Sequence, residues 1–124
     1  MFSFKRKIGN QAEGVALEYL SAHGLKLVEQ NYLTKLGEID IIMLDKSEQT
    51  LVFVEVRYRQ NTSFGSATDT VDQNKQVKLI RTAQYYLQQH SEYQEFICRF
   101  DVVGVESDLK YPRINWIKDA FGAQ

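Results

Sequence analysis

The chain has 124 residues, which suits one domain with a buried core and is short for two, so we expect a single domain over residues 1–124. Apolar residues make up 44% of the sequence and charged residues 25%, which is typical of a globular protein and excludes a disordered chain or a coiled coil. The formal net charge of -1 gives the whole chain no attraction for nucleic acid, so any such binding must depend on a local basic patch.

A helix is predicted near the start of the chain, over residues 8–23. Apolar residues recur there at helical spacing, and Gly24 is a typical stop signal. A short strand can follow over residues 25–28. Residues 31–37 are typical of a connection, although Tyr32 and Leu33 could extend the strand pairing.

A hairpin of two strands is predicted next, over residues 38–44 and 50–58. Both strands are rich in β-branched and apolar residues, and residues 45–49 between them suit a hairpin loop. After a further loop over residues 60–70, Asp72 can cap a second long helix that has one broad apolar face.

A strand over residues 96–105 and a short element over residues 114–117 complete the chain. We therefore expect an α/β fold with the order α-β-β-β-α-β, followed by a small tail. Tyr85 and Tyr86 on the second helix could stack on nucleic-acid bases. Aromatic residues on a helix that faces a sheet are more often core residues, so we place both in the core.

The N-terminal residues and the cysteine content favour a cytoplasmic protein. The basic cluster at residues 5–7 leads into an amphipathic pattern without the apolar segment of a secretion signal. Apolar stretches such as residues 51–54 are far shorter than the roughly 18 residues of a membrane span. Cys98 is the only cysteine, so no internal disulfide is possible, and no Cys/His spacing in the sequence resembles a zinc site.

Carboxylates from the two hairpin strands are predicted to meet. If Leu44 pairs with Leu51, the antiparallel register sets Asp40 opposite Glu55. Directly paired side chains have their Cβ atoms about 5 Å apart, and like charges placed there are destabilising unless something offsets them. A cation is the obvious offset. Oxygen ligands favour Mg²⁺ or Mn²⁺ over zinc. The spacing therefore indicates a divalent-metal site at Asp40 and Glu55.

A purely structural explanation of the same residues stays open. Charged residues at strand ends commonly face water, and the same register sets Glu38 opposite Arg57, where they could form an ordinary cross-strand ion pair. Spacing alone does not decide between a metal site and a solvated strand end.

Basic residues continue along the second helix. Lys75 lies in its first turn, and Lys78 and Arg81 follow at three-residue steps. Such a stripe could track phosphates, and a solvated helix face explains it equally well. On the strand that follows, Asp101 comes two residues after Arg99, which favours an ion pair over a catalytic role.

Five segments spread over nearly the whole chain carry recognisable motifs. They are Gly9-x-x-Ala12-Glu13-x-x-Ala16, Gly37-Glu38-Ile39-Asp40, Phe53-Val54-Glu55-Val56-Arg57-x-Arg59, Lys75 and Arg99-Phe100-Asp101-Val102-Val103. Together they resemble the YraN family of uncharacterised bacterial proteins. That family is similar to the restriction-endonuclease-like fold of archaeal Holliday junction resolvases, a mixed sheet flanked by helices with a PD-(D/E)xK active site.

The resemblance implies a role for each charged residue of these motifs. Asp40 stands at the aspartate of PD-(D/E)xK, Glu55 at its second acid and Arg57 at its lysine, while Glu13 corresponds to an acid on the first helix. Asp40 and Glu55 would bind the metal, with Arg57 and Glu13 as further catalytic residues. The nucleic-acid-binding residues would be Lys75, Arg59, Lys78 and Arg81.

The sequence departs from the motif at one catalytic position, where Arg57 replaces a lysine. Arginine stays protonated and so cannot act as a base, but it can hold a phosphate through two hydrogen bonds. This excludes a base role for the residue.

The expected function is that of an endonuclease that uses Mg²⁺ or Mn²⁺ to hydrolyse phosphodiester bonds in DNA, branched DNA included. A homodimer is implied by the resemblance, because resolvases of this fold act as dimers. Two alternatives stay open. One is a nucleic-acid-binding module that kept the fold and lost catalysis, and the other is a structural or interaction protein whose acidic cluster is structural.

Overall fold

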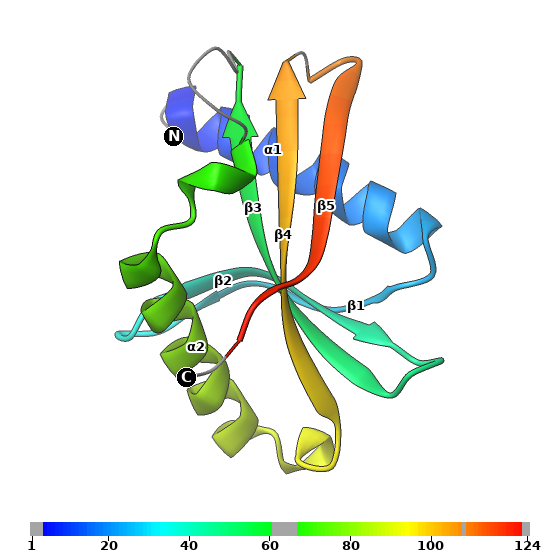
Figure 1. Cartoon of the computed structure of the whole chain (residues 1–124), viewed down its shortest axis with the longest axis vertical. Helices are drawn as coiled ribbons and strands as arrows, with labels where there is room; N and C mark the ends of the chain where they lie inside the picture. Colours follow the sequence, from blue (N-terminus) through cyan, green and yellow to red (C-terminus); the bar gives the residue numbers. More distant parts are fainter. Residues whose placement is uncertain (1–3, 61–66, 108, 123–124) are drawn as a thin grey trace.

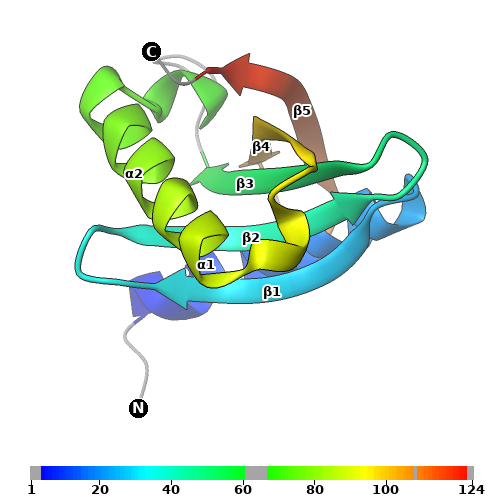
Figure 2. The ribbon, with the colours of Figure 1, turned by 90° about the horizontal axis from the view of Figure 1, so that it is seen from below.

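The structure, a computed structural model, describes residues 4–60, 67–107 and 109–122. Five strands form one mixed sheet in the order β1-β2-β3-β4-β5, with a long helix on each face (Figures 1 and 2). The elements are α1 (Phe4–Ala22), β1 (Lys26–Leu33), β2 (Glu38–Asp45), β3 (Thr50–Arg59), the 3-10 helix η1 (Ala67–Thr70), α2 (Gln73–Gln89), the 3-10 helix η2 (Ser91–Tyr93), β4 (Ile97–Ser107) and β5 (Pro112–Phe121). The predicted α/β fold and element order are confirmed, and the predicted tail is a full fifth strand.

Helix α1 ends in a hydrogen-bonded cap at Gly24, as predicted. Gly24 has a φ of +95°, a conformation that glycine adopts without a Cβ clash. The N–H of Gly24 donates to the carbonyl of Ser21 at 3.2 Å, and the N–H of Leu25 donates to the carbonyl of Leu20 at 3.1 Å. This is the Schellman arrangement, and it turns the chain directly into β1.

Strand β1 is longer than the sequence pattern predicts. It extends to Leu33, so the alternative in which Tyr32 and Leu33 continue the pairing is confirmed, and the connection begins at residue 34. A bulge between Leu27 and Glu29 and a left-handed φ of +52° at Asn31 interrupt the alternation by which a strand is recognised in sequence. The connection to β2 is therefore a tight turn over residues 34–37.

The hairpin of β2 and β3 has the predicted register, because Leu44 pairs with Leu51. On its other side β3 pairs in parallel with β4, and α2 supplies the helical crossover that parallel strands require. Strand β5 pairs antiparallel with β4 and runs to Phe121, beyond the short element predicted there.

Each face of the sheet has its own apolar core. The core under α1 contains Ala12, Ala16, Leu20, Leu25, Ile41, Met43, Val52, Val54, Val103 and Val105. The core under α2 contains Ile39, Ile42, Leu51, Phe53, Leu79, Ala83, Tyr86 and Phe100. Strands β2 and β3 contribute to both cores, so they are covered on both faces and form the rigid centre of the fold.

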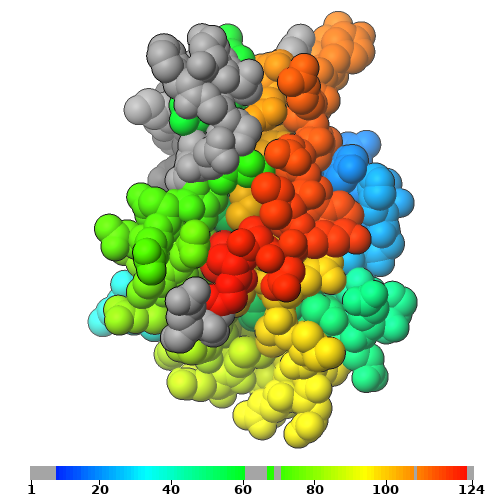
Figure 3. Space-filling model, in the orientation of Figure 1, coloured from blue at the N-terminus to red at the C-terminus, as the bar shows by residue number. Residues whose placement is uncertain are grey.

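Two further contacts position α2. Asp72 caps its first turn as predicted, with Oδ1 accepting a hydrogen bond from the N–H of Lys75 at 2.9 Å. The end of β5 lies beside the helix in the space-filling view (Figure 3), and Phe121 stacks on Phe100 with ring centroids 5.0 Å apart.

Neither of the long helices has the length and apolar character needed to cross a membrane within the described residues.

Candidate functional site

The ladder between β2 and β3 stops before the ends of the two strands. Its last pair is Ile41 with Val54. One residue further on, Asp40 Oδ2 accepts a hydrogen bond from the backbone N–H of Val56 at 2.8 Å. The Asp40 side chain thus takes the place of a backbone partner. The hydrogen bond from Val56 holds the Asp40 carboxylate between the two strands.

Glu55 brings a second carboxylate to the same place. It follows the last ladder residue of β3 and is only 4% exposed. Its carboxyl group is within hydrogen-bonding contact of the Asp40 carboxyl group. The structure therefore places these two carboxylates side by side, as predicted, although the ladder itself ends one pair earlier, and we call Asp40 and Glu55 the acid pair.

Two cations approach the acid pair, and both contact the same oxygen of Glu55. Arg57 Nη2 lies 3.0 Å from Glu55 Oε2, and Lys75 Nζ lies 3.5 Å from it. Lys75 reaches the sheet from the first turn of α2, where the helix dipole disfavours a cation, so Glu55 offsets that cost. The predicted cross-strand pair of Glu38 with Arg57 is wrong, because the ladder ends before these residues and Arg57 pairs along its own strand.

The acid pair disfavours two full negative charges. Burial, followed by the charge of Glu55, raises the pKa of Asp40 well above its usual range, while the hydrogen bond from Val56 acts in the opposite direction. Arg57 and Lys75 offset part of this charge at Glu55, and a shared proton or a bound metal ion would offset the rest.

A third carboxylate, that of Glu13, faces the acid pair from α1. Glu13 is half-buried, and burial followed by the charges of Glu38 and Glu55 raises the pKa of Glu13 to about 7. With its amide nitrogen turned toward the acids, Asn31 donates to Glu13 Oε1 at 2.9 Å and to Glu38 Oε1 at 3.2 Å. Asn31 therefore ties α1 to β2, a role that our sequence reasoning missed.

The donor set of the acid pair fits Mg²⁺ or Mn²⁺. Hard divalent cations prefer oxygen ligands, and Mg²⁺ is commonly held by one or two carboxylates together with water and substrate phosphate. Among the described residues, no group of three or more Asp, Glu, His or Cys side chains is arranged to hold a metal by itself. The remaining ligands would therefore come from water or from a phosphate.

The geometry can be compared with known proteins. The model of an uncharacterised protein family, UPF0102, matches residues 12–105, a span that includes Glu13, Asp40, Glu55, Arg57 and Lys75. The chain belongs to the UPF0102 family. This confirms the resemblance to YraN proteins, which are the same family.

Curated UPF0102 proteins match almost the whole chain. The relative from Pseudomonas savastanoi pv. phaseolicola is 47% identical over 120 residues, which is 96% of each chain. The relative from Nitrosococcus oceani is 49% identical over 116 residues, or 94% of this chain and 92% of its own. The relative from Vibrio parahaemolyticus is 47% identical over 116 residues, or 94% and 93%.

The other predicted cations of this UPF0102 protein are distributed around α2 and β3. Lys78 lies one turn after Lys75. Arg81 lies six residues after Lys75, which turns it by about 120° around the helix. Arg59 is the last residue of β3, on the face of Glu55, and its buried Nε contacts no acceptor within the described structure. The structure thus brings Lys75 to the acid pair and leaves Arg81 on another flank of α2.

Asp101 is buried and structural, which confirms the predicted ion pair. It accepts hydrogen bonds from Arg99 Nε at 3.0 Å, from Trp116 Nε1 at 2.9 Å and from the N–H of Asp119 at 2.9 Å. These contacts fasten β5 to β4 beside their bulge. Asp101 does not join the acid pair.

The two tyrosines of α2 differ in burial. Tyr86 is 1% exposed and stacks on His90 with ring centroids 3.9 Å apart, as expected of a core residue. Tyr85 is 40% exposed, so its predicted place in the core is wrong. The helix turns by about 100° per residue, which carries Tyr85 out of the face that packs on the sheet.

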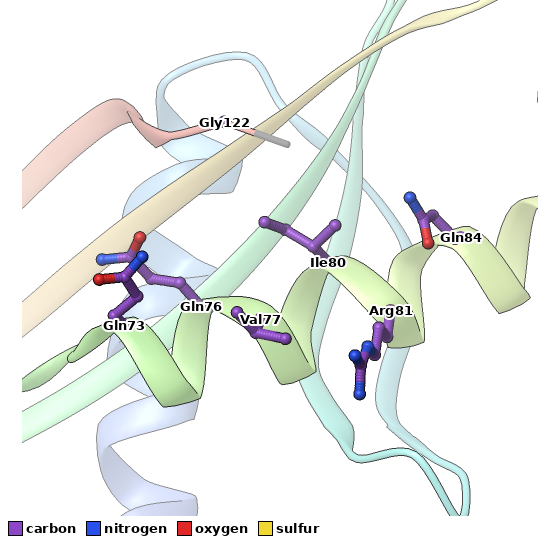
Figure 4. Close-up of a pocket in the computed structure, with 7 residues that line it drawn as sticks. All are labelled: Gln73, Gln76, Val77, Ile80, Arg81, Gln84 and Gly122. Atoms are coloured by element: carbon purple, nitrogen blue, oxygen red, sulfur yellow. The ribbon is translucent and has the colours of Figure 1, made fainter. Parts of the chain in front are cut away.

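A hollow of about 240 Å³ lies between α2 and Gly122 (Figure 4). Gln73, Gln76 and Ile80 are among the residues that line it, and none of the lining residues is acidic. Gln84 also lines it, and this residue is half a helical turn away from Lys75 around α2. This hollow is therefore separate from the acid pair.

Proposed function

We propose that this protein is a divalent-metal-dependent endonuclease that hydrolyses phosphodiester bonds in DNA, branched DNA included. The observation that supports this proposal is the meeting of Asp40 and Glu55 where β2 and β3 separate, with Arg57 and Lys75 at the same carboxylate. Acids that can hold a metal stand beside cations that can hold a phosphate, and phosphodiester hydrolysis uses both.

The acid pair would hold the metal ion. When bound, Mg²⁺ or Mn²⁺ makes water a stronger nucleophile and offsets negative charge on the attacked phosphate. The hydrogen bond from Val56 fixes Asp40 before any ion arrives, so one ligand is already positioned. The raised pKa of Asp40 means that the ion would displace a proton from the pair.

Arg57 and Lys75 would bind the phosphate. Arg57 uses one terminal nitrogen, Nη2, for its ion pair with Glu55. A planar guanidinium keeps its charge and can hold two phosphate oxygens. Lys75 has three donors, so it can contact Glu55 and a phosphate oxygen together.

Glu13 would handle a proton during the reaction. Its pKa of about 7 allows it to gain or lose a proton near neutral pH, which is the property required of a general acid or base. Asn31 holds this carboxylate through a hydrogen bond to Oε1 of Glu13.

A cleavage assay tests the proposal. Purified protein is incubated with duplex, single-stranded and four-way-junction DNA, with Mn²⁺ or with a chelator. We expect metal-dependent cutting that falls by about 10²-fold or more in Asp40→Asn and in Glu55→Gln, because each change removes a ligand charge. The matched control is Glu95→Gln, which alters an exposed glutamate just before β4 and should cut normally. Cutting that persists in either acid-pair variant contradicts the proposal.

A DNA-binding module without catalysis is the second candidate. The observation that favours it is Arg57, which cannot act as a base and already neutralises part of the charge of Glu55. It predicts DNA binding that is unchanged by chelator, and no cutting of any substrate.

A further inference from the structure

A preformed apolar groove lies between the β1–β2 turn and α2. Its volume is about 450 Å³, and we call it the turn groove. It is lined by Tyr32, Leu33, Thr34, Lys35, Leu36 and Tyr85. Figures 1 and 2 both place the turn beside α2.

The walls of the turn groove are held in place by the fold. The N–H of Thr34 donates to the carbonyl of Gly37 at 2.9 Å, and the N–H of Leu36 donates to Thr34 Oγ1 at 3.0 Å. A Cβ at Gly37 would lie 2.9 Å from Thr82 Oγ1, so the backbone of the turn is close against α2. The groove therefore does not have to form when a ligand arrives.

The surface of the turn groove is apolar and unusually exposed. Leu33 is 74% exposed, Leu36 46% and Tyr85 40%. Large apolar side chains exposed together commonly mark a binding surface. An aromatic ring with aliphatic neighbours suits the flat face of an unpaired nucleobase, which stacks on aromatic side chains.

Cations border this apolar surface. Lys35 lines the groove, and the backbone carbonyl of Lys78 would lie 3.7 Å from a Cβ at Gly37, so Lys78 is beside the turn. Two acids also border this region: Glu29, whose charge acts on Tyr32, and Glu38, which pairs with Leu33 across the ladder. Apolar surface bordered by lysines fits a nucleic-acid strand, because the bases can stack while the lysines meet the phosphates.

Two elements lead from the acid pair to the turn groove. Lys75, which contacts Glu55, is ten residues before Tyr85 on α2, and ten helical residues span about 15 Å. In the sheet, Asp40 follows Leu36 by four residues along the chain. A strand with its phosphate at the acid pair would therefore bring bases a few nucleotides away into the groove.

We propose that the turn groove binds unpaired bases of the DNA strand whose phosphate lies at the acid pair. This inference rests on the proposed function and names its substrate class, which is DNA with a single-stranded segment beside the cut. An intact duplex keeps its bases stacked, so it cannot place a base face against Tyr85.

Binding measured in chelator separates this inference from catalysis. Fluorescence anisotropy compares a short oligothymidine, the same backbone with abasic sites, and a duplex, using the full chain. We expect Tyr85→Ala and Leu36→Ser to weaken oligothymidine binding by about 5-fold or more, which is the lower range for loss of one stacked base. Duplex and abasic binding should stay unchanged. Tyr85→Phe keeps the ring and should bind like the unmodified protein.

The matched control is Tyr111→Ala, which removes a tyrosine that is 76% exposed and lies before β5. If Tyr85→Ala leaves oligothymidine binding unchanged, or weakens duplex binding equally, the inference is wrong, and metal-dependent cutting would still support the proposed function. If the unmodified protein neither binds nor cuts DNA, both fail. The mass of the particle in solution reports the oligomeric state. If Leu36→Ser has fewer copies per particle than the unmodified protein, the inference is overturned in favour of contact between copies of the chain.

Discussion

Arg57 is the residue at which the proposed chemistry departs from the lysine of the PD-(D/E)xK motif. Its guanidinium touches Glu55 and retains further donors for a phosphate. We expect Arg57→Gln to lower the cleavage rate by about 10²-fold, which is typical for loss of one charged donor to a reacting group. Arg57→Lys should keep most of the rate, because the charge remains. Single-turnover cleavage with saturating Mn²⁺ measures both. Equal losses in the two variants would show that the guanidinium shape matters more than its charge.

Asn31 is expected to stabilise the fold because its amide donates hydrogen bonds to two acids. Its amide donates to Glu13 and Glu38, and its left-handed backbone is one that aspartate also tolerates. Asn31→Asp keeps the shape but replaces the donor by a further acid. We expect a loss of about 1 to 3 kcal/mol in unfolding free energy at pH 8 and a smaller loss at pH 5, which is below the pKa of about 7 of Glu13.

Urea denaturation at the two pH values measures this effect. Asn31→Gly is the control, because it removes the side chain without straining the backbone and adds no charge. Equal losses for Asn31→Asp at pH 5 and pH 8 would contradict the electrostatic role of the amide.

Helix α2 connects the core to the site through its first turn. The Asp72 cap orders the N–H of Lys75, and the Lys75 side chain reaches Glu55. We expect Asp72→Ala to lower the unfolding free energy by about 1 kcal/mol, while Asp72→Asn, which keeps an accepting oxygen, should have little effect. Thermal unfolding of both variants checks this. A normal melting temperature for Asp72→Ala would mean that the cap does not stabilise α2.

The strands that could be predicted are those with regular alternation. The register of Leu44 with Leu51 follows from hairpin length and apolar pattern, and Asp40 and Glu55 meet just beyond its last pair. The lengths of β1 and β5 could not be predicted, because Asn31 and Asp119 have left-handed backbones and bulges interrupt both pairings. Such irregularities leave a weak trace in a single sequence.

The site was predictable only in part, for a related reason. Alternation places two carboxylates on adjoining strands, which is local information. The contact of Lys75 with Glu55 and the bridge from Asn31 to Glu13 depend on how helices dock on the sheet. The exposure of Tyr85 likewise depends on the turn over residues 34–37, which lies beside one flank of α2.

At the scale of the whole molecule, the stability contributed by Glu13 and Asp40 should fall as pH rises. Folding raises the pKa of Glu13 from 4.5 to about 7, and it raises the pKa of Asp40 as well. An acid with a higher pKa when folded holds its proton more tightly in the folded state, so deprotonation favours unfolding. Without divalent ions, we expect the unfolding free energy contributed by these groups to decrease between about pH 4.5 and pH 7.

Denaturant titrations across this range, in chelator, measure the slope. Asp40→Asn should flatten it, because asparagine has no proton to lose. Stability that is unchanged or rises from pH 5 to pH 7 in the unmodified protein, with the same slope in Asp40→Asn, would contradict the raised pKa values.

We propose that Asp40 and Glu55 converge on one cation, and calorimetric measurement of Mn²⁺ binding at pH 7.5 tests this most directly. The proteins compared are the unmodified protein, Asp40→Asn, Glu55→Gln and the Glu95→Gln control. We predict one site in the unmodified protein and in the control, with affinity reduced at least about tenfold in each acid-pair variant. Binding that is absent from the unmodified protein, or that is unchanged by removal of either carboxylate, would contradict the account.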